Sequence, residues 1–210
     1  MYPYCFWGVI TNNQDPDKLN RVTVSVPGEE EAVSEWLPVV TPYAGAGVGL
    51  SALPDVDDQV LVVSLDAAQT QMAVLGGVWS EKAKPPETKE NADADLNKDG
   101  KNALQFIKSR AGALFIFDNT ADKEKIQLIA HDGKSRLEFS AADKLVTLSS
   151  EHDITIGAKG RITIDAEEIA ITSKKQINLN ADDVQVSAKK GMTVEAKQEM
   201  TLKGSGISLN

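Results

Sequence analysis

Residues 146–209 read VTLSSEHDITIGAKGRITIDAEEIAITSKKQINLNADDVQVSAKKGMTVEAKQEMTLKGSGISL and contain a regular repeat. Pairs of apolar residues, separated by one residue, recur along this stretch, and from Val146 the first members advance by 8, 8, 7, 8, 7, 8, 8 and 7 residues. Such fixed-period self-similarity is the sequence signature of a stacked repeat structure. Each unit is predicted to be one short strand with a single inward face, followed by a corner.

The predicted inward residues form the core of this repeat region. They are Ile154, Ile156, Ile162, Ile164, Ile169, Ile171, Ile177, Leu179, Val184, Val186, Met192, Val194, Met200 and Leu202. More widely spaced pairs precede them, namely Leu114/Ile116, Ile126/Leu128 and Leu137/Phe139. No aromatic residue follows Phe139, which indicates a narrow core.

The repeat leaves two ways of stacking open. One chain could coil with three units per turn, as β-solenoids do. Alternatively, three chains could wrap around one axis, each supplying one side of every layer. Both arrangements pair most strand edges and so avoid edge-to-edge aggregation.

The first eighty residues have a different pattern, with short strands separated by turn residues. The expected strands are residues 6–10, 21–26, 36–40, 59–65 and 72–79, with Pro38 indicating an edge or a bulge. Five short strands without a convincing helix predict a small barrel, for which the OB-fold is the commonest solution. We therefore expect an all-β chain with an OB-fold domain at 1–80, a polar linker at 81–106 and a β-helical repeat region at 107–210.

Composition excludes several classes of protein. The net charge of −9, without a basic cluster, argues against binding to nucleic acid. No stretch approaches the roughly 18 to 20 apolar residues of a transmembrane helix, and no signal peptide is recognisable, so we expect synthesis in the cytoplasm. Cys5 is the only cysteine, which excludes an internal disulfide and a multi-cysteine metal site.

The chain resembles the central spike proteins of contractile injection machines, which include phage baseplate spikes, VgrG-type spikes of type VI secretion and their extracellular relatives. The blocks that carry the resemblance are GVITNN (8–13) with Asp15-Pro16 and RVTV (21–24), Trp36 with TPYAG (41–45) and Gly49, LPDVDDQVLV (53–62), VLGGVW (74–79), IKSRAG (107–112), FDNT (117–120) and KEKI (123–126). Asn20 and Asp57 stand where the family often has glycine, and Pro38 stands where arginine is frequent. We expect these departures to change local turns and not the fold.

The resemblance implies an N-terminal OB-fold followed by an intertwined, homotrimeric β-helix. It implies a force-bearing tip of a phage-tail-like particle or secretion apparatus that opens the target cell envelope and is not an enzyme. Neither the hub region that is fused ahead of the OB-fold in VgrG proteins nor an inserted lysozyme-like domain is found, so the spike is expected to sit on a separate hub protein. The end of the repeat, Ile207, Ser208, Leu209 and Asn210, would present a blunt apolar face to a PAAR-type tip protein.

Candidate sites for ions or catalysis are weak. Asp95, Asn97 and Asp99 match the first half of a calcium loop, but Phe106 stands where its last acidic ligand belongs. His131 and His152 lack a metal-binding spacing, so no metal and no cofactor is expected. Adjacent acids such as Asp57/Asp58, Glu167/Glu168 and Asp182/Asp183 point to opposite faces of a strand, which argues against glycosidase chemistry.

Two other functions remain as alternatives to the spike. An OB-type module on a β-helical stalk could bind a glycan or another ligand. A β-helical polysaccharide enzyme is the other alternative, although each unit is too short to carry the loops of a substrate groove.

Overall fold

The computed structural model describes residues 4–25, 32–66, 68, 70–88, 100 and 102–208. The chain divides into two units, Met1–Thr155 and Ile156–Asn210, which are described separately. Within the described residues there are β-strands and no helices, and therefore no helix that could span a membrane.

The first sheet forms a nearly closed five-stranded barrel, consistent with an OB fold. Its strands are β1 (Tyr4–Asn12), β2 (Arg21–Val24), β3 (Leu37–Pro38), β6 (Gln59–Ser64) and β7 (Met72–Gly77), in the order β3-β2-β1-β6-β7. A parallel bridge between Val39 and Val74 and a hydrogen bond from the Val40 N–H to the Val74 carbonyl, 2.8 Å long, bring the two edges together. The small hairpin of β4 (Ala44–Gly45) and β5 (Val48–Gly49) lies between β3 and β6 in the chain. All five expected strands are confirmed.

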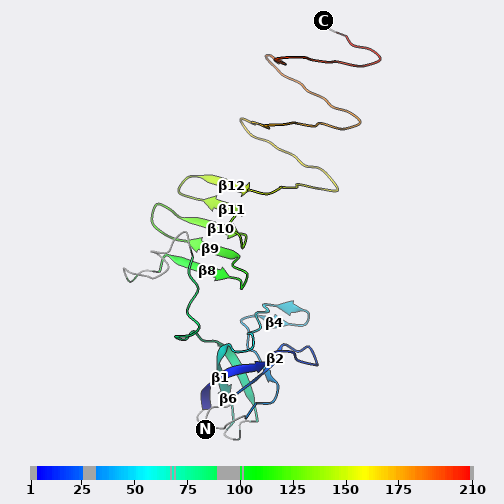
Figure 1. Ribbon diagram of the computed structural model, residues 1–210. Helices are drawn as coiled ribbons and strands as arrows, with labels where there is room; N and C mark the ends of the chain where they lie inside the picture. The colour runs from blue at the N-terminus through cyan, green and yellow to red at the C-terminus, as the bar shows by residue number, and fades with distance from the viewer. Residues whose placement is uncertain are drawn as a thin grey trace. The chain divides into compact units, whose positions relative to one another are not determined.

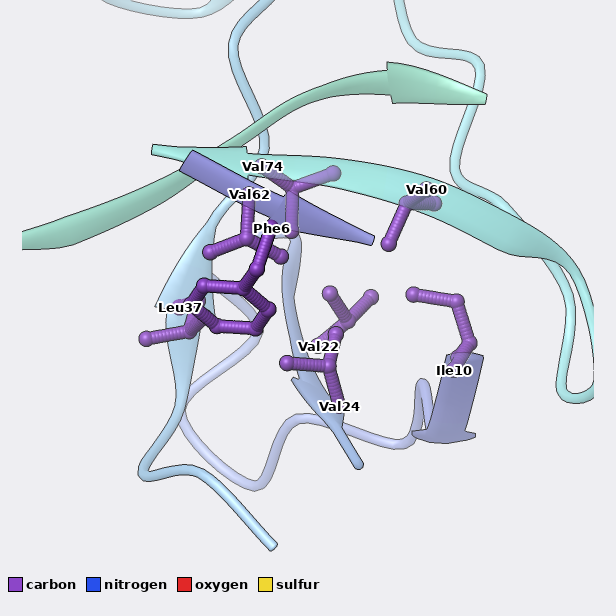
Figure 2. Close-up of a cluster of buried hydrophobic side chains, with 8 residues drawn as sticks. All are labelled: Phe6, Ile10, Val22, Val24, Leu37, Val60, Val62 and Val74. Carbon is purple, nitrogen blue, oxygen red and sulfur yellow. The ribbon is translucent and has the colours of Figure 1, made fainter. Parts of the chain in front are cut away.

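The barrel core is apolar and comes from alternate residues of its strands. In β2 every second residue is buried, as the alternation of polar and β-branched residues in Arg21–Val24 predicts, and β6 shows the same alternate burial within an apolar run. Figure 2 shows the side chains that meet inside the barrel: Phe6, Ile10, Val22, Val24, Leu37, Val60, Val62 and Val74.

Two barrel turns place non-glycine residues in the left-handed region. Asn20 has a φ of 59° and Asp57 a φ of 73°. These are the two positions where the resembling family often has glycine, and asparagine and aspartate tolerate this conformation better than other side chains. The departures are therefore accommodated without a change of fold.

The second sheet of this unit is an antiparallel meander. It consists of β8 (Leu104–Lys108), β9 (Leu114–Asp118), β10 (Lys125–Ile129), β11 (Ser135–Ser140) and β12 (Leu145–Ser150), paired in chain order (Figure 1). The sequence predicts a β-helix from residue 107 onward, and the structure shows antiparallel hairpins in β8–β12. The apolar pairs before Val146 lie further apart than 8 residues, which leaves room for the hairpin turns.

The second unit has no strand in its described part, residues 156–208. Figure 1 draws this segment as a winding trace from yellow to red without arrows. Its backbone bends once in every repeat unit, as the sequence predicts for corners. From residue 151 the bends lie at 151–152, 159–160, 167, 174–175, 182, 189–190, 197–198 and 205.

Candidate functional site

The meander presents one face of exposed apolar side chains, called here the open face. Residues directly opposite each other in an antiparallel pair point to the same side of the sheet. The register pairs Phe117 with Ile126, Ile126 with Phe139, and Phe139 with Val146, so these residues form a row across four strands. All four are at least 40% exposed.

A second row runs beside the first on the open face. It contains Ile107, Phe115, Leu128, Leu137 and Leu148, again by direct pairing from strand to strand. The rings of Phe115 and Phe117 pack against each other with centroids 4.7 Å apart. Contiguous apolar patches of more than a few hundred Å² are uncommon on monomers and mark interaction surfaces.

The other face of the meander is covered in the chain itself. Leu104, Ile116 and Ile129 are at most 6% exposed, and Gln127 is fully buried. The Gln127 amide donates to Glu138 Oε2 at 2.6 Å, while its own Oε1 has no partner among the described residues. The sheet therefore has one core face and one face that the chain leaves uncovered.

The open face is continuous in sequence with the repeat. Val146 and Leu148 lie on it, and they are also the first pair of the series with 7 or 8 residues per unit. The pair Leu114/Ile116 does not belong to this series, because Phe115 and Phe117 are the β9 residues that lie opposite Leu128 and Ile126. In β9 the apolar side of the repeat is thus formed by Phe115 and Phe117.

The repeat units are not paired within the chain. Beyond Glu151, no backbone–backbone hydrogen bond joins the described residues. The predicted core residues are exposed, from 47% for Met200 to 78% for Leu179. An unpaired β segment with an uncovered apolar face has neither the hydrogen bonds nor the burial that stabilise strands.

A buried ion pair fixes the turn between β1 and β2. The Asp15 side chain is 3% exposed and accepts from Arg21 Nη2 at 2.7 Å and from Arg21 Nε at 2.9 Å. The Leu19 backbone N–H also donates to it, at 2.9 Å. Hydrogen bonds from Arg21, and then from the backbone, hold the pKa of Asp15 well below its ordinary value, and Asp15 in turn raises the pKa of Arg21.

A second set of charges links the barrel to the meander. Arg110, in the turn between β8 and β9, contacts Asp55 at 2.6 Å and Asp58 at 2.9 Å, both in the turn before β6. These contacts raise the pKa of Arg110, mainly through its hydrogen bond to Asp58. Because the three side chains are exposed, the contacts orient the turns more than they stabilise the fold.

The residues considered for chemistry do not come together in the described structure. Cys5 is an exposed thiol on β1, and no group of three possible metal ligands occurs among the described residues. His152 contacts Asp132 at 3.1 Å, and Asp132 has a lowered pKa, chiefly because it accepts the Lys134 N–H. The calcium candidate Asp95, Asn97 and Asp99 lies outside the described residues, as do Leu209 and Asn210, whereas Ile207 and Ser208 are exposed.

The barrel has a recognisable counterpart among known protein families. Residues 6–79 match the Type VI secretion system/phage-baseplate injector OB domain. The match covers β1 to β7, so the injector-type OB domain coincides with the barrel. This relates the chain to baseplate and spike proteins and indicates a structural role in a phage-tail-like machine. No curated protein matches the chain.

Sequence reasoning missed the open face of β9. All four residues from Leu114 to Phe117 are apolar, so a period of two does not distinguish the sides of this strand. The larger aromatic side chains on one side were the available signal.

Proposed function

We propose that this chain is the central spike subunit of a contractile, phage-tail-like injection machine. Three copies wind their repeat regions around one axis into a β-prism, and the injector-type barrels form its base on a hub protein. On sheath contraction, this rigid tip opens the target envelope. A PAAR-type protein binds the exposed residues Ile207 and Ser208.

The observation that carries the proposal is the uncovered repeat. Fifteen inward residues from Ile154 to Ile207 are all at least 47% exposed in the single chain, and no described unit pairs with another unit of the same chain. A single-chain solenoid would pair each unit with the third unit after it. Three intertwined chains supply both the missing strand neighbours and the missing apolar cover.

The trimer also gives the open face a cover. Its two rows lead directly into the pair Val146/Leu148, so three meanders around the same axis would enclose Phe117, Ile126 and Phe139. The proposal therefore explains two uncovered apolar surfaces with one axis. It also provides stiffness, because intertwined chains cannot fray one strand at a time.

The trimer and the solenoid predict different neighbours for the residue that lies between the two members of each apolar pair. Ala170, Asn178 and Thr193 hold equivalent positions in their units. In the trimer, Ala170 lies beside Asn178 of another copy, one strand spacing away, and about 14 Å from Thr193 of its own chain. In the solenoid, Ala170 lies beside Thr193 of the same chain.

Cysteine pairs test this difference. The exposed Cys5 is first replaced by serine, and the pairs Ala170→Cys/Asn178→Cys and Ala170→Cys/Thr193→Cys are compared after oxidation. The spike predicts three chains linked by the first pair, no bond in the second, and a light-scattering mass of three times 22.6 kDa. A monomer with a bond inside the chain in the second variant would refute the spike and favour the ligand-binding module.

A further inference from the structure

The charged residues of the repeat follow a pattern of their own. From residue 151 to residue 208, every charge lies between two apolar pairs and none lies inside a pair. The backbone bends in these same segments, so each charge lies at a corner or within two residues of one. Corner charge is therefore a property of each unit, separate from its apolar side.

The sign of the corner charge alternates from one unit to the next. The eight units from Val146 to Gly206 carry, in order, Glu151 and Asp153; Lys159 and Arg161; Asp165, Glu167 and Glu168; Lys174 and Lys175; Asp182 and Asp183; Lys189 and Lys190; Glu195, Lys197 and Glu199; and Lys203. Their formal net charges are −2, +2, −3, +2, −2, +2, −1 and +1, with His152 neutral. The alternation is not interrupted over the whole series.

Apart from Glu151, which contacts Lys134 at 3.5 Å, the single chain forms no ion pair with these charges in its described part. Within the described residues 154–208, no charged side chain has an ion-pair partner, and all of these residues are exposed. Successive corners belong to different sides of a prism, so they do not meet inside one chain. The complementary partner of each corner is therefore expected on another copy.

We propose that the alternating corner charges set the register in which three copies of this chain wind together. The inference rests on the proposed spike. In such a trimer, the neighbours of a unit on the same side are the preceding unit of one partner copy and the following unit of the other. Each acidic corner then lies between two basic corners, one strand spacing of about 4.8 Å away on either side.

The apolar pairs cannot specify this register by themselves. Every unit places the same kind of apolar pair in the core. A chain displaced along the axis by one unit, relative to its two partner copies, would therefore bury the same kind of side chains. The displacement would place every corner of that chain beside corners of its own sign. A displacement by two units restores the signs but leaves two units at each end without neighbours.

The spacing makes the effect relevant at physiological salt. Neighbouring corners lie closer than the Debye length of about 8 Å at that ionic strength, so their interaction is only partly screened. Like charges directly opposite each other on neighbouring strands are destabilising. Alternation therefore acts chiefly against wrong registers, as charges at the flanking positions of coiled coils do.

The test exchanges the charges of two neighbouring units without changing the net charge of the chain. The exchanged variant is Lys174→Asp/Lys175→Asp/Asp182→Lys/Asp183→Lys, and it creates like-charge contacts with the units on both sides. The neutral control is Lys174→Gln/Lys175→Gln/Asp182→Asn/Asp183→Asn. Both are made in the full chain with Cys5→Ser and the Ala170→Cys/Asn178→Cys pair, which reports on correct register.

At low salt, the fraction of chains linked into trimers should fall in the order parent, neutral control, exchanged variant, with a several-fold loss in the last. High salt should raise the exchanged variant toward the neutral control, because the charges are exposed. An exchanged variant that crosslinks as well as the parent at low salt would overturn the inference and leave the spike intact. A parent that does not link three chains would instead overturn the spike itself.

Discussion

The barrel and the repeat region have the same alternation of apolar and polar residues, but the chain buries the apolar side chains only in the barrel. In β2 of the barrel, Val22 and Val24 alternate with polar residues and are fully buried by strands of the same chain. In the repeat, Ile162 and Ile164 alternate with polar residues in the same way and are 54% and 69% exposed. Alternation thus predicts which side chains share a face, and it does not identify the chain that covers this face.

The meander lies between these two cases. Ile116 is fully buried by its own chain, whereas Phe117, the next residue, is 41% exposed on the open face. The proportion of apolar surface that the chain covers therefore decreases from the barrel through the meander to the repeat. Each part should respond differently to the loss of an apolar side chain.

The largest difference is expected for a charge placed in the two cores. Val62→Asp would bury an unpaired carboxylate in the barrel, which should destabilise it by about 4 kcal/mol or more. Ile171→Asp should leave barrel unfolding unchanged and abolish assembly. Urea unfolding can be followed by tryptophan fluorescence, because Trp7, Trp36 and Trp79 all lie in the matched OB region.

Light scattering measures the mass of the assembly and is the second readout for Val62→Asp and Ile171→Asp. A suitable control is Val56→Asp, since Val56 is 47% exposed in the barrel domain and should tolerate the charge. If Ile171→Asp kept the mass and the detergent resistance of the parent, the apolar pairs of the repeat would not form a shared core.

A smaller difference is expected between the two faces of the meander. Ile116→Ala should lower stability by about 2–5 kcal/mol whether or not the chain is assembled, because it opens a cavity in a closed core. Phe139→Ala should matter only after assembly, since Phe139 is 46% exposed in the single chain.

Amide hydrogen exchange of β9 to β11 measures both effects. The unassembled state can be provided by the Ile171→Asp background. Equal losses of protection for Phe139→Ala in the assembled protein and in this background would show that the open face stays uncovered in the assembly.

The sequence was sufficient for the barrel and for the corners of the repeat. Turn residues separated the five strands clearly, and one bend per unit appears where the spacing of the apolar pairs places it. The third strand was expected over residues 36–40, but the regular part of β3 covers only Leu37–Pro38, where proline limits the pairing.

Two features could not be predicted from local pattern. The apolar side of β9 depends on its register with β10, which an apolar run from Leu114 to Phe117 does not reveal. The number of chains around the axis is not encoded in the period, because units of 7 or 8 residues suit three intertwined chains and one chain coiling with three units per turn equally. Both the apolar side of β9 and the number of chains around the axis depend on which strands lie beside each strand in space.

A moderate effect is expected at the charged turn of the barrel, which has no equivalent in the repeat. Since the pKa of Asp15 is lowered in the folded state, its contribution to stability is present above the ordinary value of 3.8 and is lost as the pH falls below it. Asp15→Asn should lower the melting temperature by several degrees at pH 7 and flatten the loss of stability in acid. Thermal unfolding of the barrel from pH 7 to pH 2 measures both, and parallel pH profiles for the variant and the parent would contradict this role.

The smallest effect concerns Asp57, whose φ of 73° is unfavourable for most side chains. Glycine has no Cβ and adopts this conformation freely, whereas alanine lacks the local tolerance of aspartate. Asp57→Gly should therefore stabilise the barrel by about 1 kcal/mol or less, partly offset by the greater freedom of glycine in the unfolded chain. Asp57→Ala should destabilise it, which gives the order glycine, aspartate, alanine in urea unfolding followed by tryptophan fluorescence. Equal stability of the glycine and alanine variants would assign the effect to the lost carboxylate, because both variants remove it and only the backbone preference distinguishes them.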